Sequence, residues 1–95
     1  MNEIDKLTYI WVFKGEKANF PSGVFSIKET ADEWIKRNKL TGVLTKYPVN
    51  VGVYDWAIDQ KLFTPKKDDH YSPLFIGKFT SASMEHYHYE DGDIE

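Results

Sequence analysis

The fold is decided by one stretch of six residues near the N-terminus, Thr8-Tyr9-Ile10-Trp11-Val12-Phe13. The stretch consists of β-branched and aromatic side chains, which favour extended backbone. A continuous apolar run without polar alternation is typical of a central strand that is covered on both faces. We therefore expect the remaining elements to form a sheet around this strand.

A second strand and a helix follow the first strand. Residues 14–19 have the composition of a loop, and a Pro/Gly corner leads into a short strand at 24–26. Ser26 and Glu29 have the spacing of a capping box, which predicts that a helix starts there. Ala31, Trp34 and Ile35 at positions i, i+3 and i+4 predict an amphipathic helix over 28–38 that buries one face. Strand character resumes at 43–47 and completes a β–α–β unit.

The second half of the chain predicts two more helices and a last strand. Residues 49–58 are ambiguous, because their valines favour a strand while their apolar spacing is helical. We favour a helix from about Gly52 to Lys61, with Asn50 as its cap and Trp56 facing the core. Residues 64–70 are a surface loop, and Ser72 before Pro73 predicts a short capped helix.

These elements predict an α+β fold. We expect a small, mainly antiparallel sheet of about four strands with two or three helices packed on one side, in the order β-β-α-β-α-α-β. Ninety-five residues form a single domain, 1–95, in which 1–6 and 92–95 are candidates for disorder. An edge strand, either the second strand or the last, offers unpaired backbone groups through which a homodimer can form.

Composition and charge exclude several classes of protein. The chain has no cysteine, and therefore no disulfide, thiolate metal site or thiol nucleophile. The N-terminus lacks a signal peptide and no apolar run approaches a membrane span, so we expect a cytoplasmic protein with no membrane partner. The net charge of −3 argues against a nucleic-acid partner. The 12 lysines and arginines all lie within 1–78, whereas five carboxylates and no lysine or arginine follow.

The last strand has the most distinctive pattern of side chains. If it is extended, His86, His88 and Glu90 lie on one face, and Tyr87 and Tyr89 lie on the other. We expect the tyrosines to pack inward, which leaves the histidines and the acidic residues displayed. Tyr54 and Asp55 are expected to be exposed as well, because Trp56 faces the core.

Several motifs together resemble a known family. These motifs are Trp11-Val12-Phe13-Lys14-Gly15, Phe20-Pro21-Ser22-Gly23-Val24-Phe25, Ala31 with Trp34-Ile35, Tyr47-Pro48, Tyr54-Asp55-Trp56-Ala57 and His86-Tyr87-His88-Tyr89-Glu90-Asp91-Gly92. Spanning nearly the whole chain, they are similar to a family of small, uncharacterised bacterial proteins, a domain of unknown function. The resemblance implies a stand-alone bacterial domain and supplies no reaction, substrate or catalytic residue.

The sequence favours a binding function. No nucleophile elbow, phosphate-binding loop or dinucleotide motif is present, so we assign no catalytic residue. We expect a small non-enzymatic interaction module that binds a protein, in one form an immunity or antidote protein for a basic partner. The candidate partner-binding residues are Tyr54, Asp55, His86, His88, Glu90 and Asp91.

Metal chemistry is the alternative. His86 and His88 on one strand face supply two imidazole ligands, and His70 or Glu90 can add a third. This pattern suits zinc or another divalent metal, in a metal-dependent enzyme or a metal sensor. A strand whose polar side chains simply face water explains the same pattern, and we favour that explanation.

Overall fold

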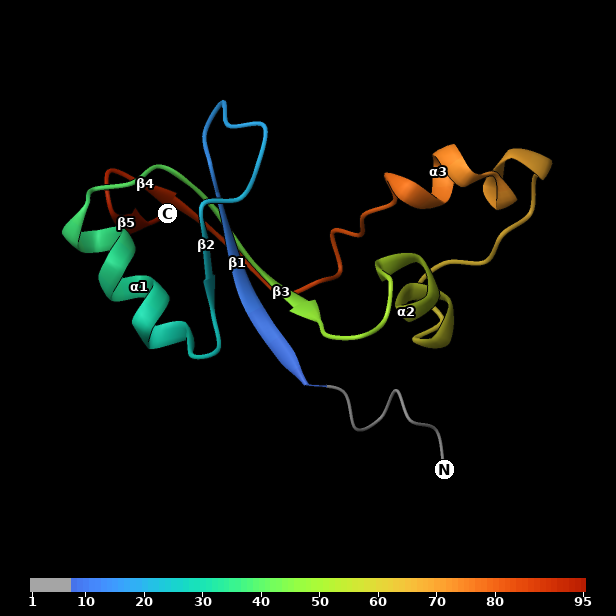
Figure 1. Ribbon diagram of the computed structural model, residues 1–95, viewed down its shortest axis with the longest axis horizontal. Coiled ribbons are helices and arrows are strands. Elements are labelled where there is room, and N and C mark those ends of the chain that lie inside the picture. The colour runs from blue at the N-terminus through green and yellow to red at the C-terminus, as the bar shows by residue number, and fades with distance from the viewer. Residues whose placement is uncertain (1–7) are drawn as a thin grey trace. The chain divides into compact units, whose positions relative to one another are not determined.

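The computed structural model describes residues 8–95, and residues 1–7 lie outside this description (Figure 1). The candidate disorder at 1–6 falls on those residues. The described chain divides into two compact units. The sheet unit comprises Tyr9–Tyr47 and Met84–Glu95, and the helical unit comprises Pro48–Ser83 together with Thr8. That residues 1–95 form a single domain stays a prediction.

The sheet unit is built on a five-stranded antiparallel sheet. In the strand order β2-β1-β3-β4-β5, the bounds are β1 Tyr9–Gly15, β2 Gly23–Phe25, β3 Gly42–Pro48, β4 His86–Glu90 and β5 Asp93–Ile94. The predicted α+β class is confirmed, whereas the prediction of about four strands is wrong by one. The predicted strand at 8–13 is β1 and lies between β2 and β3, as expected for a central strand.

Strands β1 and β3 run antiparallel. At one end of the pair, Glu16 N donates to Thr41 O at 2.9 Å, and at the other end Val49 N donates to Thr8 O at 2.8 Å. The two backbones approach closely at Gly42, where an added Cβ would lie 2.4 Å from the Lys14 carbonyl oxygen. Only glycine fits this position, because any side chain would collide with the backbone of β1.

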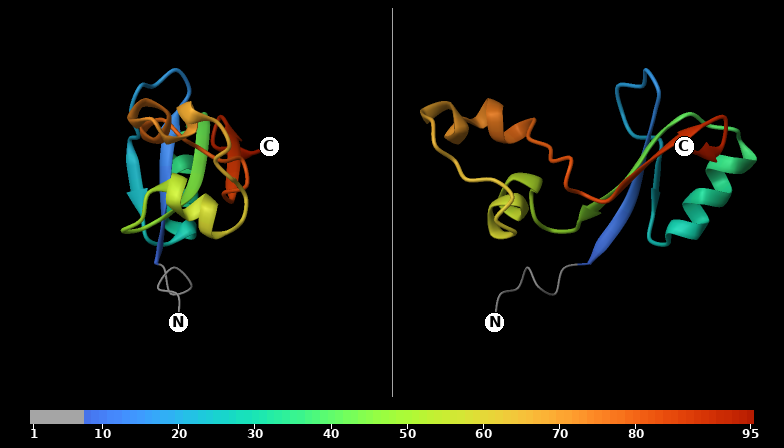
Figure 2. Two further views of the ribbon diagram at one scale, coloured as in Figure 1. Left: turned by 90° about the vertical axis from the view of Figure 1, so that its right-hand side faces the viewer. Right: turned by 180° about the vertical axis from the view of Figure 1, so that it is seen from behind.

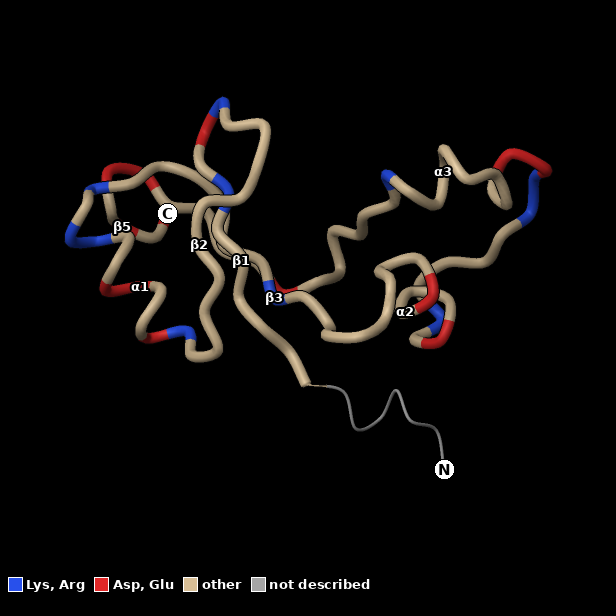
Figure 3. Tube along the Cα trace, in the orientation of Figure 1, with Lys and Arg blue, Asp and Glu red and all other residues tan. Residues whose placement is uncertain are grey.

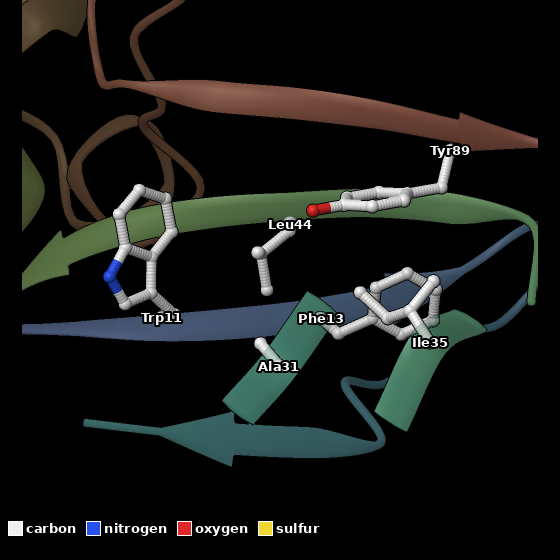
Figure 4. Close-up of a cluster of buried hydrophobic side chains, with 6 residues drawn as sticks. All are labelled: Trp11, Phe13, Ala31, Ile35, Leu44 and Tyr89. Atoms are coloured by element: carbon white, nitrogen blue, oxygen red, sulfur yellow. The ribbon is translucent and has the colours of Figure 1, made fainter. Parts of the chain in front are cut away.

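The helix α1, Lys28–Arg37, covers one face of this sheet (Figures 1 and 2). Figure 4 shows the core between them, to which β1, β3, β4 and α1 each contribute. The buried side chains of this core are Trp11, Phe13, Ala31, Ile35, Leu44 and Tyr89. Within the sheet unit α1 is the only helix, so its single apolar stripe of Ala31 and Ile35, flanked by half-buried Trp34, closes the core.

The start of α1 differs from the prediction. Ile27 is the N-cap residue and no side chain caps the helix, so the capping box between Ser26 and Glu29 is wrong. The helix begins at Lys28, which places Ser26 one residue outside the position from which a hydroxyl reaches the first-turn N–H groups. Glu29 still stabilises the N-terminal end of α1, because a carboxylate in the first turn interacts favourably with the helix dipole.

The fifth strand comes from the C-terminal residues, which the sequence had marked as candidates for disorder. Strand β5 pairs with β4 through Tyr89 opposite Ile94 and Glu90 opposite Asp93. The connecting residues Asp91 and Gly92 have φ values of 50° and 92°. Positive φ at both central positions is what a two-residue hairpin turn requires, and an Asp-Gly pair is a strong sequence signal for it.

The helical unit contains three short helices. They are α2 at Val53–Asp59, the 3₁₀ helix η2 at Asp68–Tyr71 and α3 at Pro73–Gly77. The predicted cap of α3 is confirmed, since Ser72 Oγ accepts a hydrogen bond from Phe75 N at 3.1 Å. The predicted cap of α2 is wrong, because Gly52 is the N-cap residue and Asn50 adopts a left-handed turn with a φ of 68°. Helix α2 is also three residues shorter than Gly52–Lys61, and the predicted loop contains η2.

An aromatic cluster forms the interior of the helical unit. Its rings are Tyr54, Phe63, His70, Phe75 and Phe79, with neighbouring centroids 4.8 to 6.3 Å apart. Trp56 and Ala57 are buried, which confirms that Trp56 faces inward. Within residues 8–95, no helix is long and apolar enough to cross a membrane.

Candidate interaction surface

The alternation along β4 separates two kinds of side chain. Tyr89 is 2% exposed and belongs to the core, and Tyr87 packs against that core. His88 and Glu90 are exposed, and His86 is half-buried. The predicted inward tyrosines and the outward His88 and Glu90 are therefore confirmed as placement, because strand side chains alternate between the two faces of a sheet, whereas His86 is half-buried, as is Tyr87.

Hydrogen bonds fix both tyrosines. The Tyr89 hydroxyl donates to Asp32 Oδ1, and the same carboxylate accepts from Lys28 Nζ at 2.9 Å. Burial, followed by this hydrogen bond to Asp32, raises the pKa of Tyr89. Tyr87 donates to Glu85 Oε2 at 2.5 Å, and this hydrogen bond is the main reason that the pKa of Tyr87 is raised. Tyr89 therefore links β4 to α1, and Tyr87 links the strand to Glu85, the residue that precedes it.

The two histidines of β4 are close neighbours. Their ring centroids are 5.4 Å apart. The His86 Nδ1 atom lies 2.7 Å from the Met84 carbonyl oxygen, and since that oxygen can only accept, Nδ1 carries the hydrogen. The neutral His86 ring therefore keeps its lone pair on Nε2, which is the arrangement found in many metal-binding histidines.

Within the described part of the chain, no third metal ligand lies beside this pair. Among residues 8–95, no group of three His, Asp or Glu side chains is arranged to hold a metal ion. His70 has a different role within the helical unit. Its Nδ1 accepts hydrogen bonds from Lys66 N at 3.0 Å and Lys67 N at 3.3 Å, and its ring packs between Phe63 and Phe75. The described contacts of His70 are those of a residue that supports a loop.

Tyr54 and Asp55 differ in exposure. Tyr54 is 8% exposed, and its hydroxyl donates to the His70 carbonyl oxygen at 2.8 Å. The expectation that Tyr54 is displayed is therefore wrong, because its ring forms the centre of the aromatic cluster. Burial is the main cause that raises the pKa of Tyr54. Asp55 is exposed, so of this pair only Asp55 is available at the surface.

The C-terminal hairpin concentrates negative charge. Four exposed carboxylates lie on the β4–β5 hairpin, and we call them the acidic edge: Glu90, Asp91, Asp93 and Glu95. They appear as red segments around β5 in Figure 3. The turn is fixed to the loop after α1, because Gly92 N donates to Leu40 O at 2.9 Å and Asp91 N donates to Thr41 Oγ1 at 3.0 Å.

A hollow of about 300 Å³ adjoins the acidic edge within the sheet unit. It is lined by residues of β1, the turn after it, β3 and β4–β5, among them Lys14, Lys17, Val43, His88 and Glu95. The sequence alone does not predict this hollow. It follows from the strand register, which places Val43 opposite His88 and the start of β3 beside the end of β1.

Comparisons with known proteins identify a family and nothing beyond it. Neither the curated proteins nor the solved structures contain a match to the chain. A family model described as a domain of unknown function, DUF7710, matches residues 10–95. Within residues 8–95, this range covers every helix and, apart from Tyr9 at the start of β1, every strand. The chain therefore belongs to the family of the domain of unknown function DUF7710.

Proposed function

We propose that the protein is a small non-enzymatic interaction module that binds a basic protein partner through the acidic edge and the adjoining His86 and His88. The observation that carries this proposal is the division of β4 into two faces. Tyr87 and Tyr89 pack on the core from one face of the strand, while His88 and Glu90 are exposed on the other. A rigid element that displays charged side chains is typical of a recognition surface.

Charge gives this surface a preferred partner. The four carboxylates of the hairpin favour a positively charged partner, because opposite charges accelerate encounter. Lysines also lie nearby, since Lys14 and Lys17 line the hollow together with Glu95. The hairpin is also preorganised by the bonds of Gly92 and Asp91 to the loop after α1. Binding therefore orders few additional side chains and loses little conformational entropy.

An immunity or antidote protein for a basic toxin is one concrete form of this proposal. The small size of the chain and the clustered acidic residues support it. In that form, the acidic edge neutralises a basic surface of the toxin, and the half-buried His86 contributes ring area and a hydrogen-bonding group near the centre of the contact.

Charge reversal tests the proposal. The wild-type chain, the double variant Glu90→Lys/Asp93→Lys and the matched control Glu29→Lys/Glu33→Lys would each be used to capture proteins from the native host. Both variants change the net charge by the same amount, and all four positions are exposed. We expect a stoichiometric, basic partner to be captured by the wild type and the control, and to be lost from the hairpin variant. Equal capture by all three, or no stoichiometric partner, would overturn the proposal.

A second candidate function, a metal sensor or metal-dependent enzyme, is favoured by one observation. The His86 and His88 rings are adjacent, and Met84 O orients His86 so that Nε2 keeps its lone pair. A physiological metal would then bind Nε2 of His86 and one ring nitrogen of His88, together with water or a ligand from a partner. Calorimetric titration of untagged protein with zinc tests this. One-to-one binding that is lost in His86→Ala/His88→Ala and kept in His70→Ala supports the site, and no binding rejects it.

A further inference from the structure

The two edges of the sheet differ in charge. At one end of the strand order β5 carries the acidic edge, and at the other end lies β2. We use the name β2 edge for residues 20–27, Phe-Pro-Ser-Gly-Val-Phe-Ser-Ile. This segment has no charged side chain, whereas four of the six residues 90–95 are carboxylates.

The β2 edge also displays apolar side chains. Phe20 is 77% exposed, Val24 63% and Ile27 56%. Single exposed apolar residues are normal on protein surfaces. Three of them lie within eight consecutive residues around a strand at the end of a sheet. Residues 71–76 of the helical unit also expose Tyr71, Leu74 and Ile76, so what distinguishes the β2 edge is that its apolar side chains accompany a strand with an unpaired backbone edge.

The backbone of β2 is paired on one side. Strand β2 pairs with β1, with Val24 opposite Val12, and in the described chain no strand lies beyond it. Natural sheets protect such edges by keeping the strand very short, with charged side chains, with proline or with a covering segment. Strand β2 is short, with three residues, but Gly23–Phe25 has neither a charge nor a proline, and within residues 8–95 no strand pairs with its outer edge.

We propose that the β2 edge pairs with the β2 edge of a second copy of this chain, antiparallel about a two-fold axis at Val24. A two-fold axis brings the same surface of both copies together, so the segment has to be complementary to itself. An uncharged apolar strand meets this requirement. The acidic edge does not meet it, because like charges opposite each other destabilise a strand pair.

The dimer would leave the acidic edges free. Each copy buries its β2 edge at the centre of a continuous sheet, and the two acidic edges lie at the opposite ends of the strand order. The pairing does not rest on the proposed basic partner, and it holds whether or not such a partner exists. Because three residues provide few backbone hydrogen bonds, we expect a reversible dimer that depends on concentration.

Sedimentation equilibrium tests the dimer with a matched pair of variants. Val24→Lys places two like charges face to face, and we expect it to weaken dimerisation by about tenfold or more. Leu74→Lys replaces a comparably exposed apolar residue of the helical unit, and we expect it to dimerise like the wild type. A wild-type chain that stays monomeric up to about 1 mM would overturn the proposal. So would a dimer that Val24→Lys leaves intact or that Leu74→Lys abolishes.

Oxidative cross-linking tests the position of the axis. The chain has no cysteine, so Val24→Cys introduces a single thiol. Residues directly opposite each other in an antiparallel pair have Cα atoms about 4.5 to 5.5 Å apart, within the range of a disulfide. We expect a disulfide-linked dimer from Val24→Cys and none from Leu74→Cys at the same concentration. A dimer of Val24→Cys that does not cross-link would reject pairing about Val24.

Discussion

The hydroxyl of Tyr89 donates a hydrogen bond to the carboxylate of Asp32, which joins β4 to α1 across 57 positions of sequence. The same carboxylate is paired with Lys28 one turn earlier on the helix. This short chain of polar groups lies at the margin of an otherwise apolar core. It fixes the strand that carries the histidines against the helix that covers the sheet.

Removing the Tyr89 hydroxyl should destabilise the fold. Tyr89→Phe keeps the buried ring and loses the bond to Asp32, so we expect the free energy of unfolding to fall by about 1–2 kcal/mol. Tyr87→Phe loses a bond at an exposed site and should have a smaller effect. Chemical denaturation of both variants measures the difference. Equal losses of unfolding free energy in the two variants would show that the hydrogen bond to Asp32 stabilises the fold no more than the exposed hydrogen bond of Tyr87.

The same residue predicts a dependence of stability on alkaline pH. The pKa of Tyr89 is raised in the folded state, so the folded chain retains a proton that the unfolded chain loses near pH 10. The stabilisation is therefore complete below this pH and is lost as the pH rises above it. We expect the difference in unfolding free energy between wild type and Tyr89→Phe to shrink from pH 8 to pH 11. Parallel pH profiles would contradict the assignment.

Gly92 should be essential for the acidic hairpin. Its φ of 92° disfavours any other residue, and an added Cβ would lie 3.2 Å from backbone atoms of Lys36 and Lys39. We expect Gly92→Ala to cost about 1–3 kcal/mol. The control is Gly77→Ala, where a Cβ meets no atom within 4 Å, and its effect should stay within about 0.5 kcal/mol. Thermal unfolding compares the two, and equal midpoints would refute the role of the turn.

His70 should protect two backbone amides. Its Nδ1 accepts from Lys66 N and Lys67 N, so His70→Phe keeps an aromatic ring and removes the acceptor. We expect these two amides to exchange with solvent faster, while amides in β1 keep their protection. Hydrogen exchange followed by NMR resolves the individual residues. Unchanged exchange at Lys66 and Lys67 would show that the hydrogen bonds do not persist in solution.

Local pattern predicted much of the fold. The run at 8–13 gave β1, the spacing of Ala31 and Ile35 gave α1, and Ser72 before Pro73 gave α3 with its cap. Each of these signals depends on near neighbours in sequence. The predicted capping box is wrong, because the spacing of Ser26 and Glu29 alone does not fix where the helix begins. A Ser26 cap requires the helix to begin at Ile27, whereas it begins at Lys28.

The missed features depend on distant contacts or on short signals. The helical spacing of Tyr54 relative to Trp56 predicts an exposed side chain, but the ring of Tyr54 packs against Phe63, Phe75 and Phe79, which come from later segments of the chain. The fifth strand has only two residues, although the Asp91-Gly92 turn before it was visible in the sequence. The hollow beside His88 depends on strand register, which the alternation of one strand does not reveal.

The pairing of β3 with β4 has a topological consequence. These strands are neighbours in the sheet, with Leu44 opposite Tyr87, yet the helical unit lies between them in the chain. In terms of connectivity, that unit is the loop of a β-hairpin. Because the entropic cost of closing a loop grows slowly with its length, the sheet places few demands on what the loop contains. A change in the length of the segment between the two strands should therefore cost the pairing of β3 with β4 little free energy.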